Sequence, residues 1–125
     1  MTEYGGAHNS GGIYRVKPDD TDFLKLHDFD WDNTTNGSLP QGGLTLVGSV
    51  LYGMTTEGGT HNDGCIFKTN TDGSGFTVLH NFAYASSGKS PKGTLTLTGG
   101  MLYGTANEGG TTYYGTLFRL DTDGK

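Results

Sequence analysis

A segment that recurs along the chain constrains its fold more than any other feature of the sequence. Residues 51–73 return as residues 102–124, and a shorter copy lies near the start. The glycine pairs that mark the three copies begin at Gly5, Gly58 and Gly109, which are 53 and then 51 positions apart. A repeat of about 50 residues is one supersecondary unit that cannot bury its faces alone. We therefore expect the chain to fold as an array of stacked units.

Each copy contains four segments with the character of a β-strand. Apolar and polar residues alternate over 44–47 and 95–98, a glycine-containing turn follows each, and return strands are expected over 50–55 and 101–105. A loop with the glycine pair leads to the third strand, and a turn rich in Asp, Asn, Thr and Gly leads to the fourth. The third strands are expected over 12–16, 65–68 and 116–120, and the fourth over 23–29 and 76–82.

The repeat length and the strand pattern predict an all-β fold made of four-stranded antiparallel β-propeller blades, about two and a fraction per chain. We expect a single repeat-array domain with a partial blade over 1–39, a full blade over 40–90 and a partial blade over 91–125. Incomplete blades expose strand edges. Two interpretations follow: the sequence is a piece of a longer array, or copies form a homo-oligomeric ring in which a fourth strand completes the blade of the next chain.

Composition narrows the class of protein. The 23 glycines and 32% hydrophobic residues would favour disorder if the glycines were scattered, but they recur in register with Tyr, Phe, Ile and Leu. A net charge of −5 without a basic stripe argues against a nucleic-acid partner. No run of 18 apolar residues is present, so no membrane span is expected. The single cysteine, Cys65, cannot form an intramolecular disulfide and is interpreted as a small buried or half-buried residue.

The pattern Leu-Tyr-Gly-x-x-x-Glu-Gly-Gly-x-x-x-x-Gly-x-Leu/Ile-Phe-Lys/Arg, with Leu-His-x-Phe and Pro-x-Gly-Gly-Leu downstream, resembles the Gloeo/Verruco tandem repeat. That resemblance implies a bacterial repeat of long arrays, often exported or anchored at the cell surface. It carries no established activity. The first copy departs from the pattern because Tyr4 stands where Glu57 and Glu108 stand.

The loop between the second and third strands holds the best candidates for a ligand-binding face. Glu57 and Glu108 precede the glycine pair, where each could bind a ligand or cation at the rim of a ring or could simply fix the loop. Exposed polar and aromatic residues at one loop position of each copy could form a repeated face. These residues are His8 and Asn9 in the first copy, His61 and Asn62 in the second, and Thr112 and Tyr113 in the third.

The sequence supports a metal or cofactor site less well than it supports a ligand-binding face. His27 and His80 recur in Leu-His-x-Phe, but no further ligands converge on them by spacing, so a structural role is favoured. Asp28, Asp30 and Asp32 alternate as at the start of a calcium loop, although Asn33 replaces the glycine expected at the sixth position. A solvated acidic loop, with Trp31 capping the blade or meeting a neighbour, is the favoured interpretation. No cofactor is expected.

No catalytic triad, paired carboxylates or phosphate loop is found in the sequence. The leading hypothesis is a non-enzymatic module for binding or scaffolding, with a glycan or protein ligand at the blade loops. The first alternative is a purely structural, self-assembling repeat without a ligand. An enzyme with its site in the central channel is the least favoured hypothesis.

Overall fold

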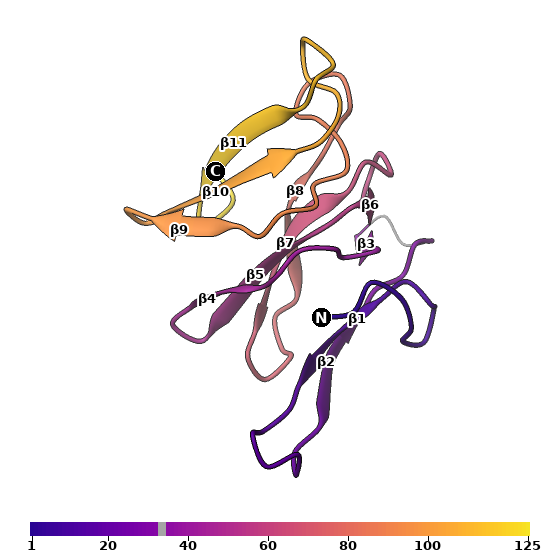
Figure 1. The fold of residues 1–125 in the computed structure, drawn as a ribbon, viewed down its shortest axis with the longest axis vertical. Helices are drawn as coiled ribbons and strands as arrows, with labels where there is room; N and C mark the ends of the chain where they lie inside the picture. Colours follow the sequence, from indigo (N-terminus) through magenta and orange to yellow (C-terminus); the bar gives the residue numbers. More distant parts are fainter. Residues whose placement is uncertain (33–34) are drawn as a thin grey trace.

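The computed structural model of the chain describes residues 1–32 and 35–125. This part of the chain is all-β: it contains eleven strands and no helix, and hence no helix long and apolar enough to cross a membrane. The strands form four antiparallel sheets, and no closed barrel is formed among the described residues. Figure 1 shows the three sheets of the repeat copies following one another along the longest axis.

The middle sheet has the four strands expected for the second copy. Their order in the sheet is their order in the chain, β4-β5-β7-β8, and every neighbouring pair is antiparallel. Alternation and glycine turns put these strands where they are observed. Their bounds are β4 (Thr45–Val47), β5 (Val50–Thr55), β7 (Cys65–Asn70) and β8 (Thr77–Asn81).

The flanking sheets repeat parts of this pattern. In the third copy β9, β10 and β11 pair in chain order, and in the first copy β1 pairs with β2. Thr2 forms an isolated bridge to Gly12, as Thr55 pairs with Cys65 in the middle sheet. The bounds are β1 (Gly12–Arg15), β2 (Leu24–Asp28), β9 (Thr96–Thr98), β10 (Met101–Ala106) and β11 (Thr116–Asp121).

A short link between copies was not predicted. β3 (Gly37–Ser38), in the connection from the first copy to the second, pairs with β6 (Glu57–Gly58) in the next glycine-pair loop. The same link recurs one repeat later as the bridge between Lys89 and Glu108. Thus each connection is fastened by backbone hydrogen bonds to the loop of the following copy.

The hydrophobic cores lie between the sheets. Successive residues of β7 point to opposite faces, so Phe67 packs in the core shared with the first copy and Ile66 in the core shared with the third. Equivalent residues line both cores. The first holds Met1, Ile13, Leu26 and Phe29 against Leu44, Leu51, Phe67 and Phe76; the second includes Met54, Ile66, Leu79 and Phe82 against Leu95, Leu102 and Phe118.

Glycine in the Leu-Tyr-Gly motif is required by these cores. A Cβ atom on Gly53 would lie 2.5 Å from Cζ of Phe67, and one on Gly104 would lie 2.5 Å from Cζ of Phe118. The phenyl ring of the third strand therefore lies directly over the glycine of the second strand. The glycine of the motif therefore makes room for this ring, in both copies that contain the motif.

Candidate ligand groove

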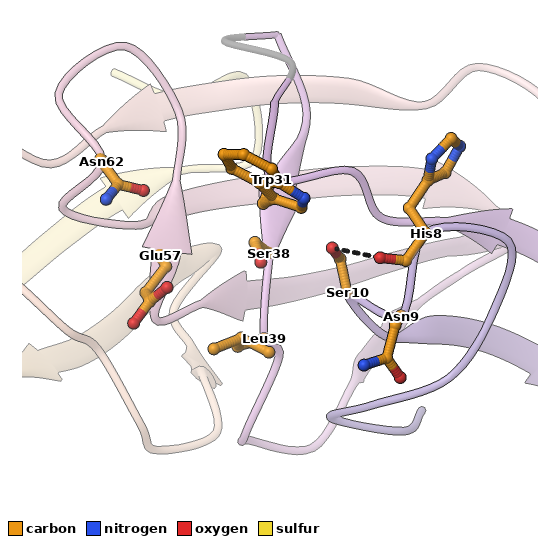
Figure 2. A pocket seen from close by; sticks show the side chains of 8 residues that line it. All are labelled: His8, Asn9, Ser10, Trp31, Ser38, Leu39, Glu57 and Asn62. Carbon is orange, nitrogen blue, oxygen red and sulfur yellow. Dashed lines mark hydrogen bonds between the residues drawn. The ribbon is translucent and has the colours of Figure 1, made fainter.

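A hollow of about 280 Å³ lies where the loops of the first and second copies meet. It is built on the β3–β6 link, which brings the connection of one copy against the glycine-pair loop of the next. Figure 2 shows Trp31 over the strand that carries Ser38, between the two loops. The residues that line this hollow, here called the groove, are His8, Asn9, Ser10, Trp31, Ser38, Leu39, Glu57 and Asn62.

The structure brings together four of the eight residues predicted as a binding face. His8 and Asn9 come from the first copy, and Glu57 and Asn62 from the second. His61 lines an adjoining hollow with Trp31, Asp32, Gly59, Thr60 and Asn62. The remaining three, Glu108, Thr112 and Tyr113, belong to the third copy and do not reach the groove.

Asn9 and Asn62 have a structural role as well. Both adopt the left-handed conformation, with φ of 54° and 56°. Their side-chain oxygens accept hydrogen bonds from the backbone amides of Gly5 and Gly58, at 3.2 and 2.9 Å. Asparagine suits this position because it tolerates positive φ and can bond its own loop. Part of the amide is thus already committed to the loop.

The side chain of Glu57, unlike those of Asn9 and Asn62, does not bond its own loop. Its backbone is held in the β3–β6 pair, while its exposed carboxylate makes no hydrogen bond or ion pair with any residue of 1–32 or 35–125. The loop-fixing alternative therefore applies to the backbone of Glu57 and not to its carboxylate. The carboxylate remains available as an acceptor for a ligand hydroxyl or amide.

Four groove residues, Ser10, Trp31, Ser38 and Leu39, were not predicted as ligand contacts. Trp31 is 66% exposed, and Ser38 and Leu39 form the floor beneath it. Leu39 has a φ of 54°, unusual for a branched residue, and its carbonyl accepts hydrogen bonds from the amide and hydroxyl of Thr56. Its counterpart in the next copy, Ser90, has the same φ of 54°, so this conformation belongs to the repeat and does not distinguish the groove.

The corresponding place between the second and third copies differs. Tyr84 and Tyr113 stand where the groove has Trp31 and Asn62, and their rings lie 6.0 Å apart. Asp63 and Lys89 stand where the groove has Ser10 and Ser38, and they form an ion pair at 3.7 Å. Small hydroxyl side chains thus leave space at the first junction that larger paired side chains occupy at the second.

Two of the three aspartates considered for calcium, Asp28 and Asp30, have other partners. Asp28 pairs with the ammonium of Lys25, which holds the pKa of the Asp28 carboxyl below its usual value. Asp30 lies 4.0 Å from the His8 ring and accepts a hydrogen bond from the amide of Asp32. No group of three or more His, Cys, Asp or Glu residues suited to a metal occurs among the described residues. Asn33, the sixth position of the loop, lies outside them.

His27 and His80 pack against aromatic rings. His27 Nε2 lies 2.8 Å from Asn36 Oδ1, and Asn36 in turn donates to the Asp28 carbonyl. Burial lowers the pKa of both histidines, and in His27 the bond to Asn36 opposes that effect. The bond to Asn36 holds the fourth strand of the first copy to the following connection, whereas the contact given for His80 is the ring of Phe82, 5.1 Å away.

Stacked antiparallel sheets in register, with a groove at one junction, define an all-β tandem-repeat protein. The family model described as the Gloeobacter/Verrucomicrobia repeat matches residues 1–125. The chain belongs to this repeat family. No curated protein and no solved structure gives a significant match to it.

Proposed function

We propose that the chain is a non-enzymatic binding module and that its groove binds a carbohydrate. The observation that carries this proposal is the exposed Trp31 beside Glu57 and the Ser38–Leu39 floor. An indole face offers a flat apolar surface for the C–H face of a sugar ring, while adjacent carboxylate and amide groups can bond its hydroxyls. A groove with an apolar platform and few fixed polar groups is typical of small-ligand sites.

The proposed architecture is a β-propeller-like array. Face-to-face packing of the sheets supports it, as do the repeated strand order and the long connection from the outer strand of one copy to the first strand of the next. Each sheet would then be a blade, and the groove would lie at the end of a junction between two blades. Export of the parent protein to the cell surface, where glycans are accessible, completes this proposal.

A glycan array probed with the labelled chain, followed by calorimetric titration of the best oligosaccharide, tests the proposal. Trp31 is the sole tryptophan, so its fluorescence reports directly on the groove. We expect the oligosaccharide to change this emission and Trp31→Ala to weaken binding at least tenfold, because stacking on an aromatic platform is lost. Tyr114→Ala is the matched control, since Tyr114 is 92% exposed and outside the groove.

A second variant tests whether binding needs the open space of the groove, with the indole of Trp31 left in place. Ser10→Asp together with Ser38→Lys introduces the pair found at the second junction as Asp63 and Lys89. We expect the double variant to fold, to retain Trp31 and to lose oligosaccharide binding because the groove is filled. Full binding by this variant, or an array without any bound glycan, would overturn the carbohydrate proposal. Selective binding of a protein at Trp31 instead would point to a protein ligand.

Self-assembly is the second candidate function. It is favoured by the exposed edge and face of β11, where Leu117 is 79% exposed although its counterpart in the middle sheet, Ile66, is 1% exposed. In this alternative a homo-oligomer forms when one chain covers the β11 sheet of another. Light scattering of the purified chain separates the two: a monomer at high concentration contradicts self-assembly and leaves the binding proposal intact.

A further inference from the structure

A pair of tyrosine rings lies at the second junction, at the place that the groove occupies at the first. Tyr84 and Tyr113 come from the second and third copies, and their ring centroids are 6.0 Å apart with planes inclined by 35°. They are 43% and 66% exposed. Because Tyr84 is the counterpart of Trp31, both junctions present an aromatic ring to solvent at the same position of the repeat.

Backbone contacts fix the position of Tyr84. Its amide donates to Oδ2 of Asp63 at 2.8 Å, and its carbonyl accepts from the amide of Gly110 at 2.7 Å. A Cβ atom on Gly109 would lie 3.0 Å from Cδ2 of Tyr84, so the tyrosine ring lies over this glycine. The aromatic surface is therefore held in place before a ligand arrives, which reduces the entropy lost on binding.

The exposure of the tyrosine pair is a property of the repeat. The pair lies between two copies that are both present, the second and the third. Asn62, the counterpart of Tyr113, is also exposed, although a further copy packs against its own copy. Packing of copies therefore leaves this loop position open to solvent.

The charges at both junctions disfavour an acidic ligand. Glu57 and Glu108 occupy equivalent positions before the glycine pair, and both side chains are exposed without an ion pair among residues 1–32 and 35–125. No lysine or arginine lines the groove, and Lys89 of the second junction is paired with Asp63. A carboxylate or sulfate on the ligand would meet uncompensated like charge.

We propose that the tyrosine pair is a second subsite for a linear, uncharged, β-linked glucan of the cellulose type, whose other units occupy the groove. Stacked sheets lie about 10 Å apart, a separation that a few linked sugar rings span. The equatorial links of such a glucan keep its rings in a flat ribbon. Successive C–H faces can therefore stack on Trp31 and then on Tyr84 and Tyr113, while hydroxyls bond the free carboxylates.

This inference rests on the proposed carbohydrate function and specifies its ligand as a chain that crosses two junctions. The tyrosine pair offers a surface, whereas the first junction offers a hollow. The pair therefore adds affinity only to a chain already held in the groove, because the linked units reach it at a high effective concentration.

Calorimetric titration of the chain with cello-oligosaccharides, from the dimer to the hexamer, tests the second subsite. We expect the hexamer to bind at least tenfold more tightly than the dimer. Tyr113→Asn is expected to remove this gain and to leave dimer binding unchanged. The variant should keep its fold, because asparagine occupies this position in the other two copies. Tyr84→Ala should act in the same way, and Tyr114→Asn, which lies outside the pair, is the matched control.

A hexamer that binds no more tightly than the dimer would overturn the second subsite and leave groove binding intact. So would an unchanged gain in both Tyr113→Asn and Tyr84→Ala, or equal binding of maltohexaose, whose α-links coil the chain. Absence of binding to every cello-oligosaccharide would also overturn this inference. In that case, binding of a different glycan at Trp31 would still support the carbohydrate proposal, so the two failures are distinguishable.

Discussion

The ring of Phe76 lies flat on the imidazole of His27, with centroids 3.6 Å apart and planes 3° apart. The two residues belong to successive copies, so their stack joins β2 of the first sheet to the residue that immediately precedes β8 in the next. The contact is buried on one side by Phe29 and Phe67. It ties the stability of the first junction to the protonation state of a histidine.

Acidification is expected to weaken this junction. Burial lowers the pKa of His27 in the folded chain below the usual 6.5, which applies to the unfolded chain. At any pH between the two pKa values the unfolded chain therefore binds more protons than the folded chain. The contribution of neutral His27 to the free energy of unfolding is therefore complete above pH 6.5. It is lost as the pH falls from 6.5 through the pKa of His27 in the folded chain. His80 shifts in the same direction. Urea unfolding from pH 7.5 to 5 should show this decrease, and His27→Gln with His80→Gln should flatten it, while the exposed His61→Gln should not.

Gly53 is expected to tolerate no side chain. Its Cβ atom would meet the Phe67 ring at 2.5 Å, so Gly53→Ala forces the ring or the strand to move and costs about 1–3 kcal/mol of unfolding free energy. Gly93→Ala is the matched control, since its Cβ atom would lie 4.0 Å from the nearest atom, the hydroxyl of Thr105. Equal urea midpoints for the two variants would contradict the packing argument.

Cys65 is expected to react only when the chain opens. The thiol is fully buried beside the Thr55 hydroxyl, and burial raises its pKa to about 11, so thiolate is scarce in the folded state at pH 8. Labelling by a thiol reagent should follow the rate of opening and accelerate in urea. A raised pKa also predicts that stability falls as the pH rises from about 9 to about 11. Rapid labelling of the folded chain at pH 8 would refute the buried assignment.

Tyr113 occupies a position that suits asparagine. Its φ is 64°, and the equivalent residues are Asn9 and Asn62. Because a bulky residue pays about 1–2 kcal/mol for the left-handed conformation, Tyr113→Asn should raise the free energy of unfolding by about 1 kcal/mol. Tyr114→Asn provides the comparison, since Tyr114 is exposed and has no positive φ. A loss of stability in Tyr113→Asn would show that its contact with Tyr84 matters more than backbone strain.

The strands were largely predictable because their signals are local. Alternation from Leu44 to Val47 and the turn at Gly48 locate β4 and β5 without knowledge of the rest of the chain. The β3–β6 link was missed because Gly37 and Ser38 have no alternation, and their partner lies in the next copy. Such pairing depends on how the copies stack, which no window of sequence contains.

The groove was half predictable for the same reason. The repeated loop position identifies His8, Asn9 and Asn62, and the pattern before the glycine pair identifies Glu57. Trp31 has a counterpart, Tyr84, but its alignment does not show that it faces the loop of the next copy. The acidic alternation around it suggested calcium, although Lys25 and His8 are the partners that the structure gives to Asp28 and Asp30.

Every junction joins unlike faces: the side that carries Ile66 meets the side that carries Phe118, as Ile13 meets Phe67 one copy earlier. Contacts between two different faces are head-to-tail contacts, so each new unit can pack in one orientation only. Each unit also depends chiefly on its immediate neighbours. Pulled from its ends, the chain is therefore expected to come apart one junction at a time, with separate force peaks instead of a single rupture.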